Sequence, residues 1–189
     1  MNITPFGSWM ISEQFPVAIV YQNNQYYLLD VKGRLGIYSP EQRVKFDFSS
    51  WTVGFLDLDQ KLVNLSFLAA GGEEDGPEIY AVILSHNGTK VWVYGFNPAE
   101  NIWVRVENLS GIMVFDSDTA YFWTRATVPL MGNKIYFPEF HGKDGVFYSL
   151  TTKKYHSYDG RFSGEGLHGC KDYLASSSIW IKPSMVLLD

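Results

Sequence analysis

The residues of this chain best suited to general acid–base catalysis are two aspartates spaced two positions apart. Asp57 and Asp59 stand in the stretch FLDLD, and on a strand both side chains project from the face opposite Leu56 and Leu58. Two carboxylates on one face are what a propeller glycosidase uses as general acid and base. A solvated strand face that precedes a turn has the same pattern, and we favour this second interpretation.

Three further acids, Glu73, Glu74 and Asp75, follow one another in the loop-like segment AGGEEDGP. Carboxylates of this kind can coordinate Ca²⁺, but the alternating acidic loop of the common calcium sites is absent, so the sequence favours a solvated loop tip. Asp116 and Asp118 flank a short turn. Their side chains are suited to accept backbone hydrogen bonds in Asx turns, which is the interpretation we adopt.

Four residues of metal-binding type, His141, His156, His168 and Cys170, lie in the C-terminal third of the chain. They lack the paired ligand spacing of zinc sites. Cys170 would act as a nucleophile only beside a base, and the sequence places none next to it. We therefore expect no catalytic residue, no metal and no cofactor.

Large aromatic side chains are the remaining candidates for binding. They could line a groove for a sugar or a peptide, but in a β array they more often pack blade against blade. One that is exposed on a rim would be the natural anchor for a partner. The tryptophans in question are Trp51, Trp92, Trp103, Trp123 and Trp180.

Composition narrows the class of protein. The chain has 189 residues, of which 46% are hydrophobic, 19% charged and 16% aromatic, which favours a globular sheet protein. A net charge of −5 argues against nucleic acid as a partner. No apolar run reaches the roughly 20 residues that span a bilayer, and a single cysteine fits a reducing compartment. We expect no membrane contact and a cytoplasmic or nuclear location.

One antiparallel hairpin occurs three times along the chain, and the predicted strands are grouped around its copies. Its copies are QYYLLDVKGRLGIY, EIYAVILSHNGTKVWVY and, from Asn133 to His156, NKIYFPEFHGKDGVFYSLTTKKYH. Equivalent tyrosines lie 53 to 56 residues apart in both strands of the hairpin, and a supersecondary unit that recurs at such a period is typical of propeller-type arrays. The equivalent residues are Tyr27, Tyr80 and Tyr136 in the first strand and Tyr38, Tyr94 and Tyr148 in the second.

Strand-like segments fill most of the rest of the chain, and no segment repeats apolar residues at helical spacing. We predict an irregular entry over residues 1–16, a β domain of three to four blade-like repeats over 17–189, and only weak structure over 157–171. The strands are predicted at 17–21, 25–31, 35–38, 44–48, 51–58, 62–68, 79–84, 90–96, 102–106, 111–115, 121–128, 134–137, 146–150 and 178–182, with a possible edge at 185–188.

The order and spacing of these segments resemble the C-terminal β domain of plant F-box proteins of the KIB type, over roughly residues 17–184. The stretch YYLLDVKGRLGIY is similar to that family's first hairpin, and VWVYGFNPAENIWVRV is similar to its unit with a Tyr and a later Trp. The strand at Lys61 to Leu65 also resembles a strand of the family. Asn133 to Phe137, with Gly145 to Leu150, resembles the family's pair "N-x-I-Y-F" and "G-V-F-d-L", and the ending Trp180 to Pro183 resembles its closing "W-x-x-P".

The resemblance implies a substrate-recruiting domain of a cullin-type ubiquitin ligase, whose partner is the protein to be ubiquitinated. Family members carry an N-terminal F-box that docks on the ligase adaptor. Nothing before Val17 resembles an F-box, so we expect no adaptor binding and consider a truncated gene product. Three units fall at or below the lower end of propeller blade counts, and we favour a partial or open array over a closed small ring.

The sequence thus predicts an all-β, propeller-like array of antiparallel meanders that acts as a non-catalytic protein-interaction domain. Two alternatives stay open. A carbohydrate-active propeller enzyme or lectin would require convergent carboxylates in a central pocket. A truncated remnant without independent function would fold poorly in isolation.

Overall fold

The computed structural model describes residues 16–30, 33–42, 63–71, 79–85, 88–116, 121–140 and 143–165. These residues form strands and one short 3₁₀ helix, η1 (Pro40–Gln42), as the absence of helical periodicity predicts. The strands are β1 (Pro16–Gln22), β2 (Gln25–Asp30), β3 (Leu35–Tyr38), β4 (Val63–Ala70), β5 (Ile79–Ser85), β6 (Val91–Asn97), β7 (Ile102–Arg105), β8 (Ile112–Phe115), β9 (Phe122–Arg125), β10 (Lys134–Phe140), β11 (Lys143–Ser149), β12 (Lys154–Ser157) and β13 (Ser163–Gly164).

The first meander, β1–β2–β3, is a separate three-stranded antiparallel sheet. Its first turn uses Asn23 and Asn24 at φ of 48° and 60°, the left-handed conformation that a two-residue hairpin turn requires. Its second turn is held by the buried Asp30 carboxylate, which accepts hydrogen bonds from the backbone N–H (2.8 Å) and the Nε–H (2.7 Å) of Arg34. A buried charge is tolerated when it is paired in this way, so both turns of this meander have a local physical cause.

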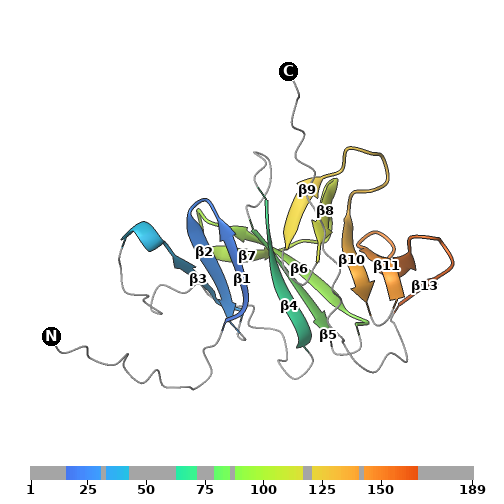
Figure 1. Ribbon diagram of the computed structural model, residues 1–189, viewed down its shortest axis with the longest axis horizontal. Coiled ribbons are helices and arrows are strands. Elements are labelled where there is room, and N and C mark those ends of the chain that lie inside the picture. Colours follow the sequence, from blue (N-terminus) through green and yellow to red (C-terminus); the bar gives the residue numbers. More distant parts are fainter. Residues whose placement is uncertain are drawn as a thin grey trace.

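The other ten strands form one sheet in the order β13-β12-β11-β10-β8-β9-β4-β5-β6-β7. It contains two four-stranded antiparallel meanders, β4–β7 and β10–β13, which the β8–β9 hairpin joins. The joints are parallel: β8 pairs with β10 over three residues, and β9 pairs with β4 at Phe122 and Ala70. Figure 1 shows the first sheet and β10–β13 at opposite ends of the molecule, with β4–β7 between them.

Asn133 fastens the parallel joint between β8 and β10. It adopts a left-handed φ of 62°, and its N–H donates to the carbonyl oxygen of Ile112 at 2.7 Å. Its side-chain oxygen accepts the N–H of Leu109 at 2.8 Å, and its amide nitrogen donates to Thr151 Oγ1 at 2.8 Å. Asparagine tolerates this conformation better than most residues, which gives a physical reason for an Asn at the start of the third hairpin.

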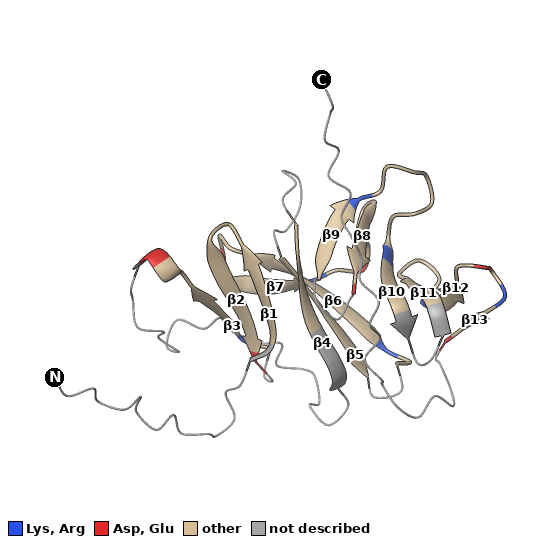
Figure 2. Cartoon of the chain, in the orientation of Figure 1, with Lys and Arg blue, Asp and Glu red and all other residues tan. Residues whose placement is uncertain are grey.

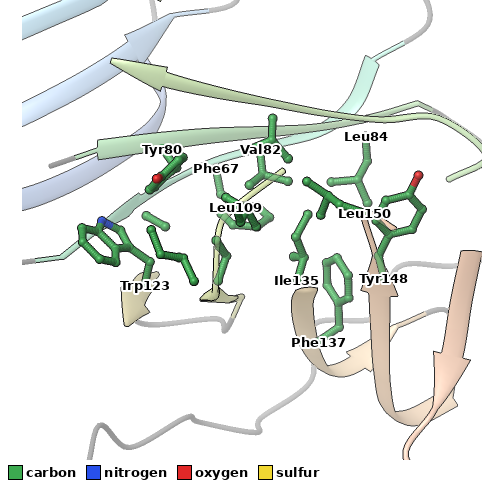
Figure 3. Packing of buried hydrophobic residues seen from close by; sticks show 14 of the residues in the cluster. Phe67, Tyr80, Val82, Leu84, Leu109, Trp123, Ile135, Phe137, Tyr148 and Leu150 are labelled. Carbon is green, nitrogen blue, oxygen red and sulfur yellow. The ribbon is translucent and has the colours of Figure 1, made fainter. Parts of the chain in front are cut away.

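The main core lies where the curved sheet brings β4–β6 face to face with β8–β12 (Figure 3). Across it, the buried Tyr155 hydroxyl of β12 donates to the carbonyl oxygen of Gly88, in the turn between β5 and β6, at 2.7 Å. The core residues are Phe67, Ala69, Tyr80, Val82, Leu84, Val93, Leu109, Ile112, Val114, Trp123, Ile135, Phe137, Val146, Tyr148, Leu150 and Tyr155.

A second core lies on the opposite face of β4–β6, under the first sheet. Tyr27, Leu29 and Leu35 of the first sheet are buried there with residues of β4, β5 and β6, among them Leu68 and Phe96. The three meanders therefore stack face on face, in the manner of successive propeller blades. The protein is all-β, with an open, propeller-like arrangement of meanders, which confirms the predicted fold class.

The tyrosine repeat has the same register in two hairpins and a shifted one in the third. Tyr38 is opposite Tyr26, the residue before Tyr27, and Tyr148 is opposite Ile135, the residue before Tyr136. In the middle hairpin Tyr94 is opposite Ala81, the residue after Tyr80. The three repeats therefore share the hairpin but not the pairing register of its strands. Because the registers differ by two residues, each side chain still points to the same face of the sheet.

Two boundaries in the C-terminal part differ from the expectation. The strands predicted at 134–137 and 146–150 are longer towards each other, because β10 extends to Phe140 and β11 begins at Lys143, with Gly145 inside β11 at a φ of 62°. The weakly structured segment over 157–171 in fact begins inside β12 and contains β13. The predicted strands at 44–48, 51–58, 178–182 and 185–188 lie outside the described residues.

Candidate interaction surfaces

Most residues that the sequence singled out for chemistry lie outside the described part of the chain. They are Asp57, Asp59, Glu73, Glu74, Asp75, Asp118, His141, His168, Cys170, Trp51 and Trp180. Asp116 is described and is buried directly after β8, where its N–H donates to the carbonyl oxygen of Tyr136 at 2.9 Å. Within the described ranges, no three His, Cys, Asp or Glu side chains come together as a metal site would require.

Two of the three described tryptophans pack against other aromatic side chains in the array. Trp123 is buried at 1% exposure and meets Tyr80 edge to face, with ring centroids 5.8 Å apart. Trp103 packs on Phe96 at 5.3 Å beside the second core, and Trp92 is half-buried on β6. The positions of Trp103 and Trp123 agree with the packing interpretation, which draws attention to other aromatic residues as anchors for a partner.

Two carboxyl groups of the described part have pKa shifts opposite to the shift that a general acid needs. The pKa of the Glu107 carboxyl is lowered, mainly by its hydrogen bond with Lys153, and the pKa of Asp159 is lowered by the hydroxyl of Ser157. A carboxylic acid that donates a proton near neutral pH needs the opposite shift. Burial raises the pKa of both Tyr80 and Tyr136 to about 12, so these hydroxyls remain protonated donors.

Ile19, Tyr21, Tyr26 and Tyr38 share the face of the first sheet that points away from the second core, and we call them the tyrosine face. Tyr21 is directly opposite Tyr26, and Tyr26 is opposite Tyr38, so three rings form a row across three strands. Their centroids are 4.9 Å and 6.2 Å apart. Tyr21 remains 54% exposed and Ile19 50% exposed, although both are large and apolar. Exposed apolar patches of this kind mark binding sites.

The opposite end of the array has a longer row of rings on the outer face of β8–β12. We call Phe122, Phe115, Tyr136, Phe147 and His156 the ring row. Each ring is directly opposite the next across four successive strand junctions. Neighbouring centroids are 4.9, 5.0, 5.8 and 5.2 Å apart, and three of the four pairs are stacked. These side chains lie on the face opposite the main core, where Tyr136 is buried and the other four are half-buried.

Tyr158 extends this surface over the glycine of β11. Its backbone N–H donates to the carbonyl oxygen of Gly145 at 2.7 Å, and its ring occupies the space where a Cβ of Gly145 would lie. An aromatic ring placed over a strand glycine protects the exposed backbone and fixes the register. The Tyr158 side chain is still 47% exposed and continues the aromatic surface towards solvent.

Neither surface was predicted from the sequence, although a signal existed for one of them. Aromatic residues at alternate or opposing hairpin positions predict rings on one face of a sheet. Tyr21, Tyr26 and Tyr38 lie in three successive predicted strands with short connections, so their row follows from hairpin register. The ring row does not follow from hairpin register. It crosses the parallel pairing of β8 with β10, and no local sequence pattern indicates that pairing.

The fold and these surfaces define the class: an open, all-β array of stacked meanders with aromatic residues on both end faces. Comparisons with models of protein families, with curated proteins and with solved structures found no match to this chain. Within the described residues, no helix is both long enough and apolar enough to cross a bilayer. Figure 2 shows that charged residues are sparse on the strands and gather mainly at their ends and in turns.

Proposed function

We propose that this protein is a non-catalytic interaction domain that recruits another protein for ubiquitination. The observation that carries the proposal is the tyrosine face, an in-register row of three rings at one end of an open array, of which Tyr21 and Tyr26 are exposed. Tyrosine is among the residues that dominate binding energy at protein interfaces. The resemblance to the β domain of KIB-type plant F-box proteins supplies the role in ubiquitination and a cytoplasmic or nuclear location.

The flat geometry of the tyrosine face favours a protein partner over a small molecule. Small-molecule sites are concave and enclose most of the ligand, whereas this surface is one side of a three-stranded sheet. Tyr21 is held by a hydrogen bond from its hydroxyl to Asn24 Oδ1 at 3.1 Å, so its ring is positioned before binding. An anchor that is already ordered loses less conformational entropy when the partner docks.

The test is recovery of a partner from plant extract with the tagged full chain, read by mass spectrometry. We expect one recurrent protein with the wild type and a loss of at least about tenfold with Tyr21→Ser/Tyr26→Ser, because removal of two interface anchors typically costs more than about 1.4 kcal/mol. The matched control is Val128→Ser/Leu130→Ser, which makes the same polar change at exposed positions between β9 and β10. It should leave recovery unchanged.

The recovered protein should also become ubiquitinated only when the intact chain is present. Both variants must keep the wild-type unfolding temperature, so that loss of recovery reports the surface rather than the fold. Equal recovery with the tyrosine variant would contradict the proposal. A bound sugar in place of a protein would favour the lectin alternative.

A further inference from the structure

Three basic side chains gather on the outer face of β10–β12, beside the ring row. Lys134 is opposite Ser149, and Ser149 is opposite Lys154, so both lysines lie on the same face with Ser149 between them. His156 is two residues beyond Lys154 and therefore shares that face. Neighbouring strands are about 4.8 Å apart, which places the two lysine backbones roughly 10 Å from each other. We call Lys134, Lys154 and His156 the basic cluster.

The positive charge of the basic cluster is not neutralised by the described part of the chain. Neither lysine forms an ion pair there, whereas the adjacent Lys153 is paired with Glu107 at 2.9 Å. Lys134 makes a cation–π contact within the chain instead, with its Nζ 4.2 Å from the centroid of the Phe147 ring. In a protein of net charge −5, a group of unpaired bases on one face is a local exception that needs a reason.

The same groups repel one another. Burial lowers the pKa of His156, and the charges of Lys134 and Lys154 lower it further. Burial also lowers the pKa of Lys134. The imidazole is held in place because its Nε2 lies 2.9 Å from Thr152 Oγ1, within hydrogen-bond distance. An anion placed among these three groups would relieve the repulsion and favour the protonated imidazole.

We propose that the basic cluster binds an acidic segment of the recruited protein, with apolar side chains of that segment against the ring row. The proposal rests on the proposed function and adds the chemistry of the partner. Carboxylates would contact Lys134 and Lys154, while Phe147 and Tyr158 supply apolar surface beside them. Charge complementarity of this kind selects a partner and directs its orientation.

The ring row itself argues for a peptide rather than for single-stranded nucleic acid. Proteins that bind such strands stack successive bases on open aromatic faces. Here the rings of Phe122, Phe115 and Tyr136 are stacked on one another at 4.9 and 5.0 Å, which leaves no space for a base between them. A side chain can instead lie across the ring edges.

The experiment measures binding of a fluorescein-labelled peptide of alternating glutamate and leucine to the full chain by anisotropy. We expect salt-sensitive binding, a loss of about tenfold with Lys154→Glu, and about a hundredfold with Lys134→Glu/Lys154→Glu, since each contact to a charged group accounts for roughly a factor of ten. The single variant is needed because Lys134→Glu also removes the contact with Phe147. The matched control, Lys90→Glu, alters an exposed lysine at the turn before β6 and should change affinity less than about twofold.

A second readout is the pKa of the His156 imidazole, followed by NMR. The acidic peptide should raise it, whereas a peptide with lysine in place of glutamate should not. The proposal is contradicted if the acidic peptide does not bind, if Lys90→Glu weakens binding as much as Lys154→Glu, or if oligothymidylate or inorganic phosphate binds the basic cluster in preference to the peptide. Failure here, with partner recovery still abolished by Tyr21→Ser/Tyr26→Ser, would remove this inference and leave the proposed function intact.

Discussion

Replacement of Trp123 by alanine should lower the free energy of unfolding by about 3–5 kcal/mol, the usual cost of removing a buried Trp or Phe side chain. Trp123 is 1% exposed, packs edge to face on Tyr80, and closes over Gly71 between β9 and β4. It lies at the parallel joint that connects the two four-stranded meanders, so the cavity cannot be filled by movement of one strand alone. Urea unfolding, followed by far-ultraviolet circular dichroism, provides the measurement.

The matched control is Trp92→Ala, which removes the same side chain from a half-buried position on β6. Its cost should be less than half that of Trp123→Ala. Equal losses for the two variants would mean that Trp123 is no more enclosed than Trp92, and would contradict the tight joint between β4 and β9.

Replacement of Gly132 by alanine should cost about 3 kcal/mol, at the upper end of the usual range for overpacking. A Cβ at this position would lie 2.6 Å from the Cα of Gly111 and 2.7 Å from its carbonyl oxygen. The obstacle is backbone, not a flexible side chain, and Gly111 cannot withdraw without disturbing the β8–β10 pairing that begins shortly after it. The measurement is again urea unfolding.

Gly160→Ala separates close packing from backbone conformation. Gly160 has a left-handed φ of 73°, but a Cβ added there would meet no other atom within 4 Å, so alanine should cost only about 1 kcal/mol. If Gly132→Ala proves no more costly than Gly160→Ala, the close approach of the chain at Gly111 and Gly132 would be refuted.

The hairpins could be predicted from the sequence because their causes are local. The Asn23-Asn24 pair and Gly33 adopt left-handed conformations where the pattern places turns. The predicted strand at 35–38 matches β3 without change, and those at 79–84 and 90–96 differ from β5 and β6 by one residue at one or both ends. Alternation of apolar and polar residues reports which face of a strand is buried, and turn residues report where the chain reverses.

The strands that escaped prediction lack this local signal. β12 buries only Tyr155, and β13 has two residues, Ser163 and Gly164. Both are strands because β11 provides a template for β12 and β12 for β13. Their secondary structure thus depends on tertiary pairing, which overrides the weak intrinsic preference of glycine and serine.

The arrangement of the surfaces depends on contacts that the sequence cannot specify. The pairing of β8 with β10 brings Phe115 beside Tyr136, and only then do two rings on one side and three on the other become a continuous row. The basic cluster has the same origin, because Lys134 and Lys154 share a face only through Ser149 of β11. The sequence drew attention to tryptophans and acids, whereas the described surfaces are built from tyrosine, phenylalanine, lysine and histidine.

The open end of the array is the central claim, and hydroxyl-radical footprinting of the intact protein tests it most directly. Tyr21 and Tyr26, exposed by 54% and 38%, should be oxidised as rapidly as Tyr158, while Tyr27 and Tyr155 on the core faces should be protected. The rates should not change with protein concentration. Protection of Tyr21 and Tyr26 equal to that of Tyr27 would show that another layer closes the first sheet, and would contradict both the open array and the interaction surface assigned to it.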